Sequence, residues 1–262
     1  MKLKEKIVRS KAKKIIDWLQ HLLLLKEDVF IAGYPKSGST WFRFILYELI
    51  TNSEASFEKS NYLIPSVGRH FIKKIKTNHG RFIQTHHPYN NKYKKAIYIV
   101  RDPRDVIISE FHYNKKMGFI PMEYEFDLFF KNFHTSQVNR YGNYSDNVSS
   151  WIDAAKNKKV NILFVRYEDM KADTLKEFIR INDFLNLNLS REILIEKIEN
   201  NDINRMREKE ISSKDKTLAK KGSKIPFVRK GEKNDWFTMF GTEKLTIIEL
   251  KYKNILDKFH YK

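Results

Sequence analysis

Asp28-Val-Phe-Ile-Ala-Gly-Tyr-Pro-Lys-Ser-Gly-Ser-Thr-Trp41 joins a short apolar run to a glycine-containing turn. The run ends in Gly33 and has the composition of a buried strand. Residues Thr40 to Thr51 follow with apolar side chains at helical spacing. A turn between a strand and a helix N-terminus aims backbone N–H groups at one point, where the helix dipole favours negative charge. This stretch therefore predicts an α/β fold with a P-loop-like, phosphate-binding strand-turn-helix unit.

Further short apolar runs predict three more strands, at Phe82–Thr85, Ile97–Val100 and Asn161–Val165. Helical patterns lie between and after them, notably over Asp105–Lys116 and Ala172–Phe184. Strands that alternate with helices predict a central parallel sheet flanked by helices. The chain shows no internal repeat, so we expect one α/β domain.

Residues 1–27 are predicted to form a basic amphipathic helix ahead of this domain, which spans residues 28–262. Apolar residues recur there at helical spacing, with Lys and Arg between them: Leu3, Ile7, Val8, Ile15, Ile16, Leu19, Leu22 and Leu23. Such a helix either lies on the domain or makes peripheral contact with a membrane surface.

The composition favours an anionic partner. The 262 residues carry 50 Lys+Arg against 32 Asp+Glu, a formal charge of +18, which suits a nucleic acid, an acidic membrane, a phosphorylated or sulfated molecule or a nucleotide. Part of this charge lies in Glu208–Lys224, which predicts a mobile basic loop. The chain has no cysteine, which excludes disulfides and thiolate metal sites and fits a reducing compartment such as the cytoplasm. No apolar run is long enough to span a membrane.

The turn Pro35-Lys-Ser-Gly-Ser-Thr-Trp41 carries groups suited to an anion. Lys36 supplies a cation, and Ser39 and Thr40 supply hydroxyl donors. The turn is not a Walker A sequence, because the Walker lysine follows the last glycine whereas Lys36 precedes Gly38. A nucleoside-triphosphate kinase is therefore disfavoured.

Two further motifs bring cations to the same edge of the sheet. Arg101 follows an apolar strand, at the carboxyl end where ligands of open α/β sheets bind. Ser109 comes eight residues later, about two helical turns on, and is expected to face the same pocket. Near the C-terminus, Arg229 and Lys230 beside Gly231 offer two cations and a close backbone approach to a phosphate.

Gln84-Thr-His-His-Pro88 closes another predicted strand. A histidine at the carboxyl end of a strand, with a pKa near neutrality, is a candidate general base. The pattern alone does not rank His86 above His87.

In order and spacing these motifs resemble the PAPS-dependent sulfotransferases, which use 3′-phosphoadenosine 5′-phosphosulfate (PAPS). The family's 5′-phosphosulfate loop, P-K-S-G-T-T-W, corresponds to Pro35–Trp41, and its R-K-G-x-x-G-D-W motif corresponds to Arg229–Trp236. Its Y-E-D-M segment corresponds to Tyr167–Met170, and its arginine with a serine eight residues on corresponds to Arg101 and Ser109. The resemblance covers most of the chain.

The resemblance implies an enzyme that moves the sulfuryl group of PAPS to a hydroxyl or amine, releasing adenosine 3′,5′-bisphosphate (PAP). His86 falls on the histidine of the family's K-T-H segment and would be the general base, with Lys36 and Ser109 as further catalytic residues. No metal is required. The implied cofactor-binding residues are Lys36, Ser37, Gly38, Ser39, Thr40, Trp41, Arg101, Ser109, Tyr167, Arg229, Lys230 and Gly231.

The acceptor is less well defined. His87 falls on a position that the family varies and is expected to line the acceptor pocket, with the aromatic residues Tyr89, Phe111 and Tyr113. A small metabolite is favoured, and a glycan or lipid stays open. The chain departs from the family pattern where Gln84 replaces the lysine of K-T-H.

The competing interpretation is a nucleic-acid-binding or other anion-binding basic protein without catalysis. It requires Lys and Arg on one face with exposed stacking aromatics and no organised anion pocket. We expect no specific nucleic-acid partner.

Overall fold

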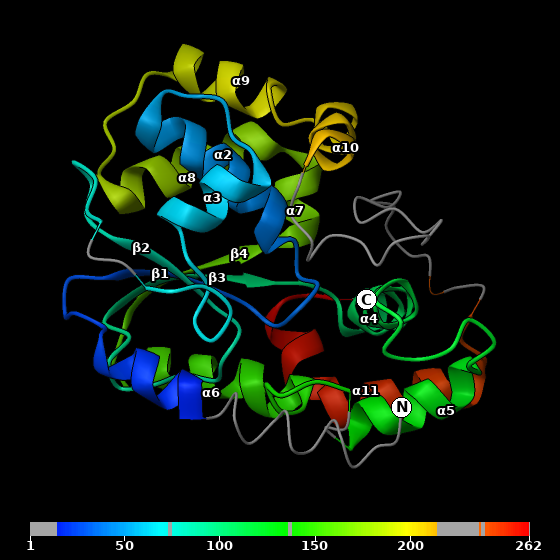
Figure 1. Cartoon of the computed structure of the whole chain (residues 1–262). Helices are drawn as coiled ribbons and strands as arrows, with labels where there is room; N and C mark the ends of the chain where they lie inside the picture. The colour runs from blue at the N-terminus through cyan, green and yellow to red at the C-terminus, as the bar shows by residue number, and fades with distance from the viewer. Residues whose placement is uncertain (1–14, 73–74, 136–137, 214–235, 237–238, 262) are drawn as a thin grey trace.

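Four parallel strands pair in the order β2-β1-β3-β4 (Figure 1). They are β1 (Val29–Ala32), β2 (Phe82–Thr85), β3 (Lys95–Val100) and β4 (Asn161–Arg166). Val29 of β1 lies opposite both Phe82 of β2 and Lys95 of β3. The computed structural model describes residues 15–72, 75–135, 138–213, 236 and 239–261. Because β1 lies between β2 and β3, the chain changes direction across the sheet at β1, and ligands of open α/β sheets bind at such a point.

Helices cover both faces of this sheet (Figure 1). Val29 and Ile31 pack with α2, α8 and α9 on one face, whereas Phe30 and Ala32 pack with α4, α6 and α11 on the other. Burial on both faces explains why β1 reads as one continuous apolar run. The helices are α2 (Ser39–Thr51), α3 (Phe57–Leu63), α4 (Pro103–Lys116), α5 (Phe126–His134), α6 (Tyr144–Lys156), α7 (Tyr167–Ala172), α8 (Thr174–Leu185), α9 (Arg191–Glu199), α10 (Ile203–Ser212) and α11 (Thr242–Lys258).

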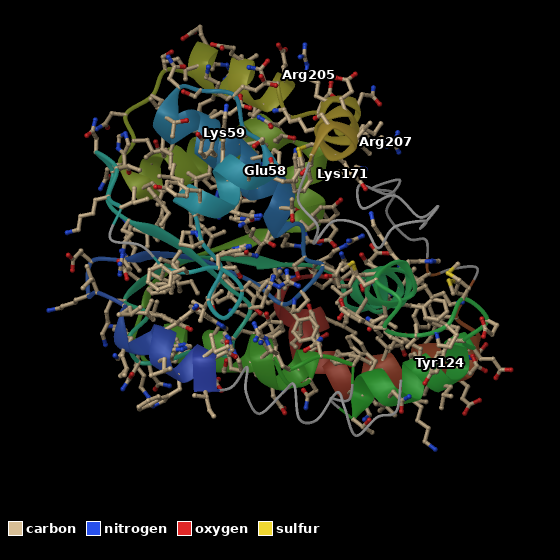
Figure 2. All side chains as sticks on the ribbon, in the orientation of Figure 1. Glu58, Lys59, Tyr124, Lys171, Arg205 and Arg207 are labelled. Carbon is tan, nitrogen blue, oxygen red and sulfur yellow. The ribbon has the colours of Figure 1, made fainter. Side chains whose placement is uncertain are left out.

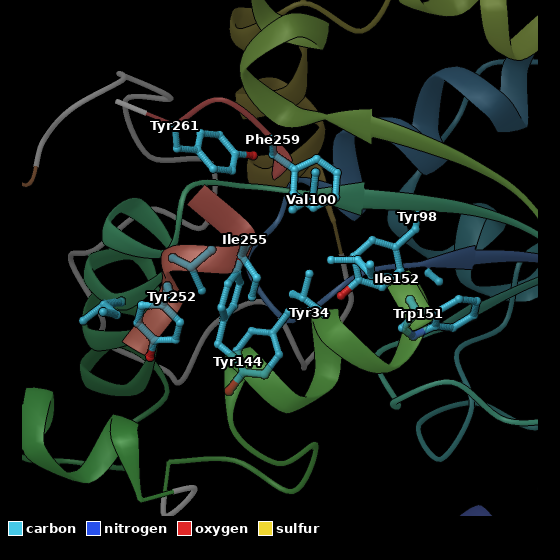
Figure 3. Packing of buried hydrophobic residues seen from close by; sticks show 14 of the residues in the cluster. Tyr34, Tyr98, Val100, Tyr144, Trp151, Ile152, Tyr252, Ile255, Phe259 and Tyr261 are labelled. Carbon is cyan, nitrogen blue, oxygen red and sulfur yellow. The ribbon is translucent and has the colours of Figure 1, made fainter. Parts of the chain in front are cut away.

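An aromatic layer between the sheet and α6 and α11 fixes the ends of two strands (Figure 3). The Tyr144 hydroxyl of α6 donates to the carbonyl of Arg101, 2.5 Å away. One turn later, the Asn147 amide donates to the carbonyl of His86 at 2.9 Å. Helix α6 therefore sets the positions of the residues that follow β2 and β3.

The expected α/β fold with a central parallel sheet is confirmed, with small shifts at the element ends. Strand β3 begins at Lys95, two residues earlier than expected. Helix α4 begins at Pro103, because the Asp102 carboxylate caps it by accepting the N–H of Arg104. Asp173 caps α8 in the same way.

The expected mobile loop over Glu208–Lys224 is wrong for residues 208–212, which belong to α10. The Lys209 ammonium is buried, 2.9 Å from the Glu48 carboxylate of α2, and also donates to the Asn201 side chain. Burial and these partners explain why a lysine in a basic segment is packed rather than solvated. Residues 214–224 lie outside the described residues.

Residues 15–22 form a helix that lies on the domain by its polar side. Asp17 and Gln20 are buried; Asp17 lies 3.3 Å from the Arg140 guanidinium, and Gln20 donates to the carbonyl of His70. This orientation is the reverse of the usual amphipathic helix. The apolar side chains are exposed: Ile15 at 61%, Trp18 at 62% and Leu22 at 55%, together with Ile16, Leu19 and Leu23. Leu3, Ile7 and Val8 lie outside the described residues.

A buried ion pair ties the chain leaving this helix to the sheet. The Arg81 guanidinium donates to both carboxylate oxygens of Asp28, each at 2.6 Å, and to the carbonyl of Leu23 at 2.9 Å. Arg81 directly precedes β2 and Asp28 directly precedes β1, so this pair joins the starts of two neighbouring strands. Within the described residues, no helix is long and apolar enough to cross a bilayer.

We predict that Arg81→Met lowers the free energy of unfolding by about 3–5 kcal/mol, because it leaves the Asp28 carboxylate buried without its cation. Urea unfolding measures this loss. The matched control is Lys76→Met, which removes the cation from the exposed pair with Glu27 and should leave stability near that of the wild type. Equal losses in both variants would contradict the role given to the buried pair.

Candidate active site

The loop of residues 33–38, which we call the phosphate loop, connects β1 to α2. Lys36 has a φ of 73° and Gly38 a φ of 92°, so the chain turns through two left-handed residues before the helix begins. A Cβ on Gly38 would lie 2.5 Å from the Tyr167 ring, and only glycine fits there without a shift. No side chain among the described residues caps the N-terminus of α2. The first N–H groups of this helix are thus available to an anion.

Arg101 lies beside this loop, as its place at the end of β3 predicts. Its guanidinium donates to the carbonyl of Lys36 at 3.1 Å and stacks 4.4 Å from the centre of the Tyr167 ring. The Asp105 carboxylate lies 3.9 Å from the same guanidinium. Ser109, on α4, is half-buried and makes no side-chain hydrogen bond within the described part of the chain. Its expected contact with the pocket stays a prediction.

Two aromatic residues border the loop on the side of α10. Trp41 and Tyr167 meet edge to face, with their ring centres 6.4 Å apart. The Trp41 indole N–H donates to the carbonyl of Asn201 at 2.8 Å, which brings the start of α10 next to it. Ile203 is 37% exposed there. The structure thus brings together Trp41 and Tyr167, which the resemblance places among the cofactor-binding residues.

His86 is buried at the carboxyl end of β2. Its Nδ1 lies 2.6 Å from the carbonyl of Gly33, and its Nε2 lies 3.0 Å from Nε2 of Gln84. Burial, and then the nearby Arg69 guanidinium, lower the pKa of His86 to about 3. The imidazole is therefore neutral near neutral pH, which is the state that a general base requires.

His87 points toward the helix of residues 15–22. Its Nε2 lies 3.4 Å from the Asp17 carboxylate, and its ring packs edge to face on Tyr141. Burial is the first cause that lowers its pKa to about 3. The ring of His86 packs on Tyr141 as well, so Tyr141 contacts both histidines.

Lys36 packs against Tyr113, one of the residues expected to line the acceptor pocket. Its ammonium lies 4.1 Å from the centre of the Tyr113 ring. Burial lowers the pKa of Lys36 to about 8, and the buried Glu110 carboxylate opposes that shift. The exposed Arg69 guanidinium donates to the Tyr113 hydroxyl at 3.3 Å. Lys36, Tyr113 and Arg69 therefore form one wall beside His86.

Three features of this site were not predicted from the sequence. They are the place of Arg69, the contact between Gln84 and His86, and the position of Tyr141 beside both histidines. Arg69 lies in the irregular segment between α3 and β2, where no motif or periodicity marks it. Only the resemblance drew attention to Gln84, as a departure. Tyr141 is one of many aromatic residues that follow His86 in the sequence, which gives no way to rank it above the others.

Other expected residues lie apart from this cluster. Phe111 is buried in the core against Phe126 and Phe129. The Tyr89 hydroxyl donates to the carbonyl of Lys159, at the opposite edge of the sheet from His86. Arg229, Lys230 and Gly231 lie outside the described residues. Trp236, which ends their motif, is buried under the Arg104 guanidinium, 4.2 Å from its ring centre.

No group of acidic residues and histidines within the described residues is arranged to hold a metal ion. The site instead gathers cations, N–H groups and hydroxyls at the carboxyl ends of β1, β2 and β3. Such a set binds an oxyanion and can stabilise negative charge that develops on a leaving oxygen.

Comparisons with known proteins show the family of this chain. A family model described as the sulfotransferase domain matches residues 26–260. Sulfotransferase 1B1 of Canis lupus familiaris is 29% identical over 250 residues, covering 86% of this chain and 83% of the relative. Sulfotransferase 1B1 of Mus musculus is 30% identical over 250 residues, with 86% and 82% covered.

Solved structures share the fold. The crystal structure of mouse sulfotransferase SULT7A1 complexed with PAP has a TM-score of 0.70 at 26% identity and covers 88% of this chain and 84% of its own. Retinol dehydratase in complex with androsterone and inactive cofactor PAP has a TM-score of 0.69 at 22% identity, covering 89% and 81%. At that identity the second likeness bears on the fold alone.

We predict that Gly38→Ala weakens PAP binding about tenfold or more, because an added Cβ meets the Tyr167 ring and a left-handed non-glycine residue costs about 1–3 kcal/mol. Isothermal titration calorimetry measures the change. Gly142→Ala is the matched control, since Gly142 has a φ of 82° and open space where its Cβ would lie. Unchanged affinity in Gly38→Ala would show that the loop conformation does not determine binding.

Proposed function

The chain belongs to the sulfotransferase domain family and is a PAPS-dependent sulfotransferase, and we propose that it transfers the sulfuryl group to a hydroxyl or amine of a small metabolite with His86 as the general base. One observation carries this proposal: Lys36, Arg101 and His86 meet at the ends of three adjacent strands. We assign residues 1–27 to an N-terminal helical segment and residues 28–262 to the transferase domain. The cysteine-free composition supports a cytoplasmic location.

The described residues suit an anionic nucleotide. The uncapped start of α2, the Lys36 ammonium and the Arg101 guanidinium offer donors and charge for phosphate and sulfate oxygens. Trp41 and Tyr167 offer aromatic surface for a base. We assign Ser37, Gly38, Ser39 and Thr40 to the 5′-phosphosulfate. For the 3′-phosphate we assign Arg101, Ser109, Arg229, Lys230 and Gly231.

Catalysis by this site rests on positioning and charge. When bound, PAPS supplies the sulfuryl group and a phosphate leaving group. His86 takes the acceptor proton on Nε2, while its Nδ1–H is held by the carbonyl of Gly33. Lys36, whose pKa of about 8 keeps it mostly protonated at neutral pH, places positive charge where negative charge develops. Of the residues expected on the acceptor side, Tyr113 and His87 lie near His86, whereas Tyr89 and Phe111 lie apart from it.

A non-catalytic nucleic-acid binder accounts for less of the structure. Basic side chains on the described surface come from separate elements, including Lys59 on α3, Lys171 on α7 and Arg205 and Arg207 on α10 (Figure 2). Such a protein has no need of a neutral histidine held by a strand-end carbonyl. The organised anion site at the phosphate loop therefore favours the transferase.

We predict that His86→Ala lowers kcat by about 10²–10⁴-fold, the usual contribution of a general base, and leaves PAP affinity nearly unchanged. Steady-state transfer from PAPS and calorimetric binding of PAP measure the two effects. His87→Ala is the control. A harmless His86→Ala with a large loss in His87→Ala would refute the assignment.

The helix of residues 15–22 supports a second proposal, peripheral contact with an anionic membrane surface. Its exposed face carries Ile15, Ile16, Trp18, Leu19, Leu22 and Leu23. Residues 1–14, directly before it, carry seven Lys and Arg against one Glu. An apolar helix face with tryptophan beside a basic segment has the chemistry that binds the interface of an anionic bilayer.

We predict that the protein sediments with vesicles containing phosphatidylserine and not with pure phosphatidylcholine vesicles. The double variant Leu22→Glu/Leu23→Glu should lower the bound fraction about tenfold or more, because leucine burial contributes about 1.5–3 kcal/mol. Leu250→Glu, at a still more exposed leucine on α11, is the control. Concentration-dependent dimerisation lost in the double variant, with no vesicle binding by the wild type, would assign this face to a second copy instead.

A further inference from the structure

The hydrogen bonds of His86 determine which of its nitrogens carries the proton. Nδ1 lies 2.6 Å from the carbonyl oxygen of Gly33. A carbonyl oxygen only accepts, so Nδ1 must donate. Neutral His86 therefore carries its lone pair on Nε2, which is the atom that a base uses.

That lone pair has a partner in the resting protein. The Gln84 side-chain nitrogen lies 3.0 Å from Nε2 of His86 and 3.0 Å from the Ser39 hydroxyl oxygen. The two hydrogens of one amide thus reach two acceptors, and the side chain has the orientation in which its nitrogen faces them. Gln84 is 4% exposed and His86 5% exposed, so water does not readily replace these bonds.

We propose that Gln84 is a positioning residue for the base: its amide holds His86 neutral with Nε2 fixed, and rotates when Nε2 receives the acceptor proton. This inference rests on the proposed role of His86. An imidazole nitrogen has a single lone pair, so the acceptor O–H must displace the amide N–H before it can be deprotonated.

The exchange balances atom by atom. The acceptor oxygen forms a bond to sulfur as the bond from sulfur to the phosphate oxygen breaks, and the acceptor proton moves to Nε2. Protonated His86 then presents N–H groups on both sides. Its Nδ1–H still meets the carbonyl of Gly33, while its Nε2–H requires an acceptor that the amide nitrogen of Gln84 cannot supply. Rotation of the amide brings its oxygen to that position.

The same rotation changes the hydrogen bond of Ser39, in the first turn of α2. In the resting state Ser39 accepts from Gln84, which leaves its own hydroxyl hydrogen for an anion at the phosphate loop. After rotation, Ser39 faces an amide oxygen and donates to it. Gln84 therefore links the protonation state of the base to a donor of the phosphate loop.

The charges around His86 make such an acceptor necessary. Burial, and then the charges of Arg69 from the segment before β2 and Arg43 of α2, lower the pKa of His86 and disfavour its protonated form. The Tyr141 ring packs edge to face against the imidazole. A lysine at position 84, the residue of the K-T-H pattern, has only donors. Glutamine offers a donor for the neutral imidazole and an acceptor for the charged one.

The test is nitrogen NMR of the histidine side chains in PAP-saturated protein, combined with the pH dependence of kcat/KM. In the wild type, His86 should be the Nδ1–H tautomer. Gln84→Glu should raise the pKa of His86 by more than one unit, because a carboxylate accepts from Nε2–H, and the acid limb of the rate profile should move with it. Gln84→Met offers no donor and only a weak acceptor, so it should lower kcat about tenfold or more. The acid limb of its rate profile should lie at lower pH than that of Gln84→Glu.

Finding the Nε2–H tautomer of His86 in the wild-type protein would overturn the proposal, and this measurement needs no variant. So would an unchanged titration of His86 in Gln84→Glu that still binds PAP. The tautomer is measured by NMR without any catalytic turnover. The result on the tautomer therefore holds even if His86→Ala remains active. That latter result would refute the proposed base and leave the hydrogen-bond assignment intact.

Discussion

The site depends on the close approach of β1 to β3 at Gly33. A Cβ there would lie 2.6 Å from the carbonyl oxygen of Ile99, so the chain can leave β1 in this direction only because the side chain is absent. The carbonyl of Gly33 then orients His86 from β2, and the carbonyl of Lys36, three residues on, orients Arg101 from β3. Two backbone oxygens of one loop thus hold the proposed base and the arginine that we assign to the 3′-phosphate. Both could not be held at once if β1 were at the edge of the sheet.

Helix α2, which follows this loop, is linked to α10 through the buried side chain of Lys209. Lys209 of α10 donates to Glu48 of α2 and to Asn201, whose carbonyl accepts the indole N–H of Trp41. Glu48 also accepts the backbone N–H of Ala55. The aromatic surface offered to a nucleotide base is therefore attached to the phosphate loop through α2. A basic segment folds as a helix here because its lysine has three acceptors inside the protein.

Much of the fold and of the candidate site could be predicted from the sequence, because it depends on residues that are adjacent along the chain. A buried strand, a turn with Gly38 and a helix are read from adjacent residues, and so are Arg101 and His86 at strand ends. The rest depends on tertiary contacts. The spacing of Ile15, Leu19 and Leu22 predicts that they share one helix face. It does not predict that Asp17 pairs with Arg140, which turns that face outward. Arg69 reaches the base from an irregular segment, where sequence carries no periodic signal.

If Lys36 binds the phosphosulfate as proposed, ligand binding is coupled to the uptake of a proton from solution. The Lys36 ammonium is held by burial at a pKa of about 8, close to the pH of a cell interior. A bound polyanion stabilises the charged form and draws a proton from solution onto any lysine that was neutral. Ligand affinity is then coupled to proton uptake and declines as the pH rises through and above 8. A nucleotide site built on a desolvated lysine responds in this way to alkalinity, which an arginine, charged throughout this range, would not register.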